Sequence, residues 1–181
     1  VLKALVNISD NFEIIFVNDG SPDDSLEKVL SLREKDKRIK IINLSRNFGH
    51  HQAILSGLKY TTGDYIFLID LDLEEPPELI TSFWNKINSD KKIDVVYGVQ
   101  KKRKGNYLER VLGNIFYKLH KTLIDIDYPS DTTTARLMKK EYVNSVLLYK
   151  EKELDLWTIF VLAGFNQVSL PVVKYSKGTT T

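Results

Sequence analysis

The sequence predicts an α/β fold in which a mostly parallel sheet is flanked by helices. Short apolar segments bounded by turn residues alternate with segments of helical period, which is the pattern of a sheet layered with helices. The apolar segments are hydrophobic almost without interruption, as expected for strands covered on both faces. A chain of 181 residues has the size of one domain, so we expect residues 1–181 to form a single domain.

Four strands and three helices are predicted in the first half of the chain. The strands are "EIIFVN", "IKIINL", "DYIFLID" and "DVVYGV", at residues 13–18, 39–44, 64–70 and 94–99. The helices between them span residues 21–36, 50–63 and 76–89. Ser21 is the expected N-cap of the first helix, with Pro22 at the first helical position. Three successive strand–helix–strand crossovers predict right-handed connections and a parallel sheet.

The second half of the chain is less regular. It predicts a long amphipathic helix, a short strand, two further helices and an extended segment, at residues 107–124, 134–140, 140–150, 153–165 and 166–176. No internal repeat, low-complexity tract or interdomain linker is present in the sequence.

Charge and composition exclude several classes of protein. The chain has 26 basic and 24 acidic side chains, a balance too even to indicate nucleic acid as a partner. It has no cysteine, which excludes disulfides and thiolate metal sites and fits a reducing compartment. No apolar run approaches the roughly 18 residues of a membrane span, and the first residues lack the pattern of a signal peptide.

Polar loops follow the predicted strands. Ligands of open parallel sheets bind beyond the carboxyl ends of the strands, so these loops are the expected site. They comprise residues 19–21, 45–49, 70–75 and 100–104.

The loop after the third strand is rich in carboxylates. If the chain stays extended past Ile69, Asp70, Asp72 and Glu74 project to one side. Three carboxylates facing one space favour a divalent cation, and hard oxygen ligands favour Mg²⁺ or Mn²⁺. The alternative is that these acids only complement the positive end of the following helix. That interpretation suits Glu75 and Glu78.

Two further loops have polar residues that suit a nucleotide. Asp19 at a strand end can accept hydrogen bonds from a ribose or base, and Gly20 permits a tight turn; the alternative is an ordinary strand-to-helix turn. Arg46 precedes a helix N-terminus, which favours anions. The adjacent His50 and His51 point to different sides of that helix, and we expect them to be polar surface or local structure.

Basic residues follow the fourth strand. Lys101, Lys102, Arg103, Lys104 and Arg110 either form a solvated face or bind an anionic acceptor or a membrane surface.

The segment "SDTTTARLM" contains one acid and one arginine. Asp131 among small hydroxyl residues is typical of a turn. Arg136 alternates with apolar neighbours, and a half-buried arginine requires an anion.

Taken together, these segments resemble a family-2 glycosyltransferase of the GT-A (Rossmann-like) fold. The resemblance is to the polyprenyl-phosphate branch, which includes dolichol-phosphate mannose synthase and the undecaprenyl-phosphate sugar transferases. It rests on strings that span nearly the whole chain in order: "EIIFVNDGSPDDS", "LSRNFGHHQAILSGL", "TGDYIFLIDLDLEEPPELI", "DVVYGVQKKRKG", "SDTTTARLMKKEYV", "LAGF" and "VVKYSKGTT".

The resemblance implies an inverting enzyme that uses a UDP- or GDP-sugar donor. It assigns donor binding to Asp19, Gly20, Asp70 and Asp72, with Mg²⁺ or Mn²⁺ held by Asp70, Asp72 and Glu74. On the acceptor side, it implies that Asp131 is a base or positions the acceptor. Arg103 and Arg136 are then the expected contacts to the acceptor. The resemblance also implies a place in the cytoplasm, at the cytoplasmic face of the membrane, and no nucleic-acid partner.

Departures from the family pattern leave the acceptor open. The first strand, with its P-x-Y-N-E segment, is missing, so we expect a fragment that lacks this strand and any C-terminal membrane segment. Glu74, Gln100, Thr134 and Ala135 stand where relatives often have glutamine, arginine, an acid and phenylalanine. The acceptor is therefore a polyprenyl phosphate or a cell-surface glycan. The alternative is a non-catalytic module that binds nucleotide-sugars or associates with membranes.

Overall fold

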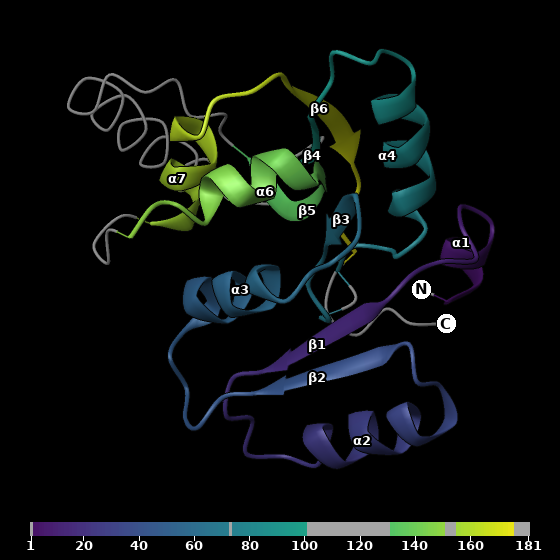
Figure 1. The fold of residues 1–181 in the computed structure, drawn as a ribbon, viewed down its shortest axis with the longest axis vertical. Helices are drawn as coiled ribbons and strands as arrows, with labels where there is room; N and C mark the ends of the chain where they lie inside the picture. Colours follow the sequence, from purple (N-terminus) through teal and green to yellow (C-terminus); the bar gives the residue numbers. More distant parts are fainter. Residues whose placement is uncertain (1, 73, 101–130, 151–154, 176–181) are drawn as a thin grey trace.

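The computed structural model describes residues 2–72, 74–100, 131–150 and 155–175. The strands of this part of the chain form two sheets, the smaller drawn below the larger in Figure 1. In the smaller sheet, β1 (Ile14–Asn18) pairs in parallel with β2 (Ile39–Asn43). The α/β class predicted from the sequence is confirmed.

The larger sheet is mixed. Its strands follow the order β3 (Tyr65–Leu68), β5 (Thr132–Lys139), β4 (Val95–Gln100) and β6 (Gln167–Val172). β5 runs antiparallel to both of its neighbours, whereas β4 and β6 are parallel. Thus β3, β4 and β6 point in one direction, and their carboxyl ends meet at one edge. The reversed β5 separates β3 from β4, which the sequence pattern did not predict.

Helices connect and cover the strands. α2 (Ser25–Lys35) and α3 (His50–Lys59) form the crossovers that follow β1 and β2, and α4 (Leu79–Asn88) connects β3 to β4. Figure 1 shows α4 on one side of the larger sheet and α6 (Lys140–Val146) with α7 (Leu156–Leu162) on the other. A short helix, α1 (Leu2–Val6), precedes β1.

Side chains of β5 alternate between two hydrophobic clusters. Ala135 and Leu137 pack with Phe83 of α4, whereas Met138 packs with Tyr142 of α6 and residues of α7. Period-2 alternation therefore places the even-numbered residues of β5 on the α7 face.

Several boundaries differ from those predicted. α2 begins at Ser25 with Asp24 as N-cap, so the prediction of Ser21 and Pro22 at the helix start is wrong. The Ser21 N–H donates to Asn18 Oδ1 at 3.1 Å, which holds Ser21 in the turn after β1. The single predicted sheet is also divided, since in the described residues β1 pairs only with β2 and β3 only with β5. α3 joins the two sheets: its Gly57 lies against Val17 of β1, and its Ile54 packs with Ile66 of β3.

Two predicted features lie outside the described residues: the helix at 107–124 and the basic run that includes Arg103. Among the helices that the structure describes, none is long and apolar enough to cross a membrane.

Candidate functional site

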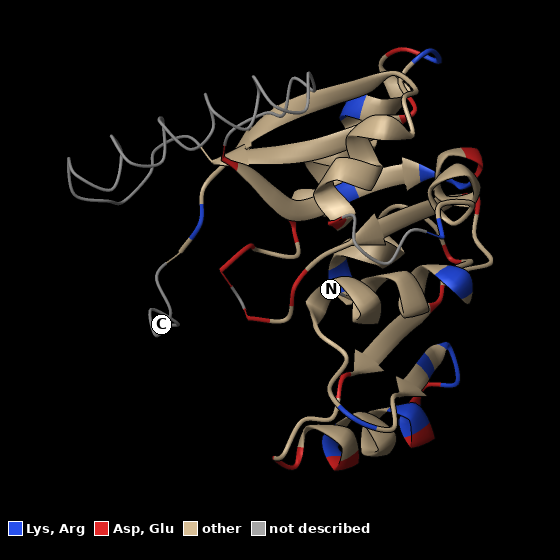
Figure 2. Ribbon diagram, turned by 90° about the vertical axis from the view of Figure 1, so that its left-hand side faces the viewer, with Lys and Arg blue, Asp and Glu red and all other residues tan. Residues whose placement is uncertain are grey.

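Residues 70–75 lie in the connection between β3 and α4 and are called the acidic loop below; residue 73 is not described. β3 ends at Leu68, and the chain then bends rather than staying extended. The expectation of an extended chain through Glu74 is therefore wrong. Figure 2 shows this loop standing out from the body of the protein, with its acidic residues in red.

Asp70 connects the acidic loop to two neighbouring elements. Its Oδ2 accepts a hydrogen bond from the Thr134 hydroxyl of β5 at 2.6 Å. Its Oδ1 lies 3.7 Å from Nε2 of His50, the first residue of α3. Asp70 is thus fixed between the larger sheet and the helix that joins the two sheets.

Asp72 and Glu74 have different surroundings. Asp72 is exposed, and its Oδ1 accepts the Glu74 N–H at 3.0 Å. The Glu74 carboxylate lies 3.5 Å from the Lys174 ammonium, and the Glu74 carbonyl accepts the Tyr175 N–H at 2.8 Å. The segment after β6 therefore runs beside the acidic loop.

The carboxylates of the acidic loop meet some of the requirements of a divalent-cation site. No group of three or more His, Asp or Glu side chains is arranged to hold a metal ion within the described ranges. Asp70 and Asp72 nevertheless supply oxygen atoms that remain partly accessible, and Mg²⁺-type ions commonly use one or two carboxylates plus water and substrate phosphates. Glu74 Oε2 lies beside the Lys174 ammonium, and a carboxylate that is paired through one oxygen still has acceptor sites for a metal.

Glu75 is buried, and the interpretation that it decorates the helix N-terminus is wrong. Only 1% of the residue is exposed, and its Oε2 accepts the Ala135 N–H of β5 at 3.1 Å. Burial raises the pKa of Glu75, and the nearby Asp70 charge adds to this rise. Thr133, Lys174 and the Ala135 N–H offset part of it. Glu78, in contrast, is exposed at the N-cap of α4, where it was expected.

Asp19 and Gly20 join the carboxyl ends of β1 and β2. The Asp19 carboxylate accepts the N–H groups of Phe48 at 2.7 Å and Gly49 at 2.9 Å. Gly20 has a φ of +70°, and a Cβ there would lie 2.7 Å from the Asn47 nitrogen, so a side chain is excluded. Because Gly49 precedes His50, this contact brings Asp19 to the same end of α3 as Asp70. Their roles in donor binding stay predictions.

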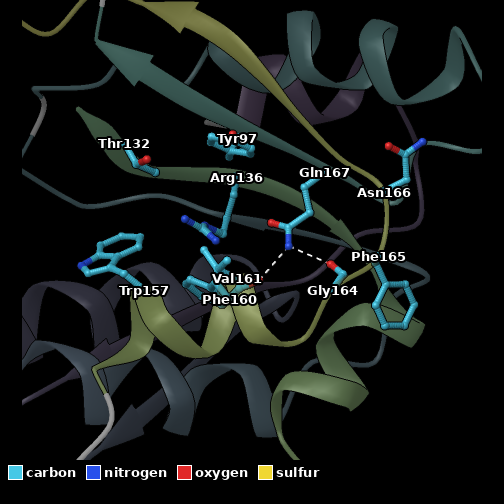
Figure 3. Close-up of a pocket in the computed structure, with 10 residues that line it drawn as sticks. All are labelled: Tyr97, Thr132, Arg136, Trp157, Phe160, Val161, Gly164, Phe165, Asn166 and Gln167. Atoms are coloured by element: carbon cyan, nitrogen blue, oxygen red, sulfur yellow. Dashed lines mark hydrogen bonds between the residues drawn. The ribbon is translucent and has the colours of Figure 1, made fainter. Parts of the chain in front are cut away.

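Arg136 borders a cavity of about 310 Å³ on the α7 side of the larger sheet. The residue is 2% exposed, and its guanidinium carbon lies 3.7 Å from the Phe160 ring centroid and 5.0 Å from that of Trp157. Figure 3 shows the guanidinium group between Trp157 and Gln167. The Gln167 amide donates to the carbonyls of Phe160 and Gly164, each at 2.7 Å, which fixes that wall.

Asp131 lies where β4 and β5 meet, directly before the first residue of β5. Its carbonyl accepts the Gln100 N–H at 2.9 Å, and the next residue, Thr132, lines the cavity. Asp131 has a φ of +68°, a conformation that non-glycine residues rarely adopt but that aspartate tolerates better than most. This fits the turn expected from the sequence.

The structure thus brings most of the predicted residues into one continuous region. Contacts lead from Asp19 to the start of α3, from there to Asp70, and through Thr134 to the strand that carries Arg136. Sequence reasoning assigned Glu75 to the helix N-terminus and gave no role to Thr134 or Trp157. Glu75 had one usable signal, since the two prolines after it keep it out of the first turn of α4.

Comparison with known proteins identifies the family. The family model described as "Glycosyl transferase family 2" matches residues 1–147. The chain belongs to glycosyl transferase family 2. A Mycobacterium tuberculosis protein that carries a glycosyltransferase name is 44% identical over 98% of this chain and 52% of its own length. The "Bactoprenol glucosyl transferase" of Shigella phage SfX is 32% identical over 84% of this chain and 50% of its own length. The chain spans about half the length of the curated relatives it matches.

A solved structure of the same fold supports the GT-A assignment. Glucosyl-3-phosphoglycerate synthase from Mycobacterium tuberculosis, in complex with Mn²⁺, UDP and glucosyl-3-phosphoglycerate, superposes with a TM-score of 0.62. The match covers 99% of this chain and 66% of that one, at 18% sequence identity. At this identity the likeness shows the fold alone, and it confirms the Rossmann-like architecture expected for a family-2 glycosyltransferase.

Proposed function

We propose that this chain is the catalytic domain of an inverting, metal-dependent glycosyltransferase that moves a sugar from a UDP- or GDP-sugar to a polyprenyl phosphate. One observation carries the proposal: the acidic loop and the Arg136 cavity meet on one strand, through the hydrogen bond between Thr134 and Asp70. A site for a sugar diphosphate and a site for an anionic acceptor then lie side by side. The bactoprenol glucosyl transferase relative supports a lipid acceptor.

The cavity favours a lipid phosphate over a neutral glycan. A buried arginine stacked on aromatic rings is suited to an anion, because guanidinium groups pair with phosphate oxygens while their faces stay on the rings. Trp157 and Val161, which are only partly buried, offer apolar surface for the first carbon atoms of a prenyl chain. In this proposal the enzyme works at the cytoplasmic face of a membrane, where such lipids are accessible.

The residues divide the chemistry between donor and acceptor. Asp70 and Asp72 would hold a Mg²⁺ or Mn²⁺ ion, which, when bound, offsets negative charge on the leaving nucleoside diphosphate. An acceptor phosphate oxygen attacks the anomeric carbon from the face opposite to the leaving group. The bond to the donor phosphate breaks with its electron pair, and the configuration inverts. An ionised phosphate needs no strong base, so Asp131 orients the acceptor while Arg136 holds its charge.

Nucleotide titration of the complete protein tests the donor half. We expect UDP or GDP to bind more tightly with Mn²⁺ present, and Asp72→Ala to remove this dependence on the metal. Asp90→Ala is the matched control, because Asp90 is an exposed acid in the turn after α4. Isothermal titration calorimetry measures both. If neither nucleotide binds, or if Asp72→Ala leaves the Mn²⁺ dependence unchanged, the donor assignment is wrong.

Arg136→Lys tests the acceptor half. Lysine keeps the positive charge but loses the planar group that stacks on Phe160, so we expect the KM for polyprenyl phosphate to rise by about tenfold. Nucleotide affinity should stay at the wild-type level. Radiolabelled sugar transfer to undecaprenyl phosphate, with a free oligosaccharide as the competing acceptor, measures the effect. Transfer only to the oligosaccharide would contradict the lipid acceptor.

A second candidate is a module that binds a nucleotide-sugar without transferring it. The pairing of Glu74 with Lys174 favours it, since the ammonium group offsets part of the negative charge that a metal ion would otherwise neutralise. Nucleotide binding without Mn²⁺ dependence and without sugar transfer would support this alternative.

A further inference from the structure

Glu75 lies at an irregular point of the larger sheet. Between the pairs Tyr97↔Arg136 and Val99↔Thr132, β5 has three residues opposite the single Gly98 of β4. Ala135 is one of these three, and it also lies beyond the β3–β5 pairing, which stops at Leu68↔Arg136. Ala135 therefore has no strand partner in either ladder, although the residue is fully buried.

The Glu75 carboxylate supplies the missing partner. Buried backbone N–H groups require an acceptor, and Glu75 Oε2 accepts the Ala135 N–H at 3.1 Å. The Thr133 hydroxyl, a further buried group of the bulge, offsets part of the rise in the pKa of this carboxylate. The residue of β4 opposite the bulge must be glycine, since a Cβ on Gly98 would lie 2.4 Å from the Thr133 hydroxyl oxygen. A side chain from another segment thus completes the bulge.

The acidic loop is consequently fixed to β5 at both ends. Asp70 at its start accepts from Thr134, and Glu75 at its end accepts from the adjacent Ala135. Asp72 lies between these two anchors. The next residue of β5 is Arg136, which borders the cavity.

We infer that Glu75 is a positioning residue, whose carboxylate holds the acidic loop and the β5 bulge in one arrangement and thereby sets Asp70 and Asp72 relative to Arg136. Bulges beside active sites commonly direct side chains in this way. Glu75 itself is buried and does not line the cavity that Arg136 borders. The inference rests on the proposed function for the meaning of Asp70 and Asp72, but the anchoring of Ala135 can be measured without it.

The test compares three substitutions of Glu75 in the complete protein. Glu75→Gln keeps an acceptor oxygen at full reach, Glu75→Asp shortens the side chain by one methylene, and Glu75→Ala removes the acceptor. Glu78→Gln is the matched control, since Glu78 is an exposed acid of the same segment and its side chain forms no cap hydrogen bond. The two readouts are the Kd for UDP with Mn²⁺ and the exchange rate of the Ala135 amide by NMR.

We expect Glu75→Asp and Glu75→Ala to raise the Kd by about tenfold and to speed Ala135 exchange by a similar factor, as for the loss of one buried hydrogen bond. Glu75→Gln and Glu78→Gln should stay within about twofold of wild type in both readouts. Wild-type behaviour of Glu75→Gln would show that the hydrogen bond to Ala135, and not the negative charge of Glu75, holds the loop.

Three results would overturn the inference: wild-type exchange at Ala135 in Glu75→Asp, a loss in Glu75→Gln as large as in Glu75→Asp, or an equal loss in Glu78→Gln. If Glu75→Ala does not fold, the aspartate and glutamine variants decide. If the wild-type protein binds no nucleotide, the proposed function fails, and Ala135 exchange alone decides whether Glu75 anchors the bulge.

Discussion

Thr134 shows how a single hydroxyl group links two parts of the site. The residue is 6% exposed, and its side chain donates to Asp70 at 2.6 Å across 64 residues of sequence. Hydrogen bonds to charged groups contribute more to stability than neutral ones. Asp70 therefore depends on Thr134 for its position at the edge of the sheet.

Thr134→Val removes this hydrogen bond and keeps the side-chain shape. We expect the free energy of unfolding to fall by about 1–2 kcal/mol and the affinity for UDP with Mn²⁺ to weaken severalfold. Urea denaturation and calorimetry measure the two effects. Thr81→Val, on the exposed surface of α4, is the matched control. Equal effects of the two substitutions would contradict the role of Thr134.

For single residues, the sequence predicted which side chains belong to the candidate site better than it predicted their contacts. Asp70 and Arg136 were singled out because a charge next to apolar residues is visible in the chain itself. The pairing of Glu74 and Glu75 with distant residues was not predictable. It depends on Lys174 and Ala135, which are 100 and 60 residues away from these two acids in the sequence and reach them only through the fold.

Among the elements, β4 and β5 fit together most tightly. Gly98 of β4 faces Thr133 of β5 and Val172 of β6 with no space for a methyl group. Close packing of this kind makes an added carbon atom costly, because the backbone of a central strand cannot move aside easily.

Gly98→Ala is expected to lower the free energy of unfolding by about 1–3 kcal/mol. In the background of Thr133→Ala, which removes the hydroxyl oxygen 2.4 Å from the added Cβ, the cost should be smaller. A double-mutant cycle from urea denaturation measures the difference. Additive effects would show that the Thr133 contact is not the cause.

Glu13, directly before β1, connects that strand with two other segments. Its carboxylate pairs with Lys40 of β2 at 2.5 Å and accepts the Thr62 N–H at 2.7 Å, in the loop between α3 and β3. Burial alone would raise the pKa of Glu13, but the bonds to Lys40 and Thr62 outweigh it and lower the pKa below 4.5.

Glu13→Gln should therefore have a pH-dependent effect. A lowered pKa in the folded state means that ionised Glu13 stabilises the protein above the unfolded-state pKa, and that this stability is lost as the pH falls through the folded-state value. We expect a cost of roughly 0.5–1 kcal/mol at pH 7 that shrinks below pH 4.5. Thermal unfolding from pH 3 to 7, with Glu27→Gln on α2 as the control, measures it. A cost independent of pH would contradict the ion pair.

The sequence predicted the elements from local patterns but not the order of the strands. Apolar runs mark the first four strands, so the ends of β1 to β4 differ from the predicted ends by at most two residues. The insertion of β5 between β3 and β4 depends on pairing across more than 30 residues of sequence, and periodicity carries no information about such partners.

Over the whole molecule, the two sheets differ in how deeply they are buried. Every residue of β1 is only half-buried, and α2, which flanks the smaller sheet, has no buried residue. The larger sheet, in contrast, contributes fully buried residues such as Val95 and Met138 to the core. Regions with few buried apolar contacts open locally at lower free energy.

Hydrogen exchange tests this difference. We expect the amides of β1 and β2 to exchange at least about tenfold faster than those of β4 and β5. Addition of UDP with Mn²⁺ should slow exchange in the smaller sheet, because Asp19 and the loop after β2 belong to the proposed donor side. Mass spectrometry of peptic fragments measures both. Uniform protection of the two sheets would contradict the prediction.

The position of β5 has a consequence for protein engineering. The acidic loop is attached to β5 through Thr134 and Ala135, and Thr132 and Arg136 of the same strand line the cavity. Substitutions of Thr134 or Ala135, which hold the acidic loop next to Arg136, are therefore expected to alter both halves of the reaction together. The opposite wall of the cavity, with Trp157 and Phe160, belongs to α7, which has no contact with the acidic loop among those described above. Libraries meant to widen the acceptor range while leaving the sugar unchanged should accordingly vary α7 and leave β5 intact.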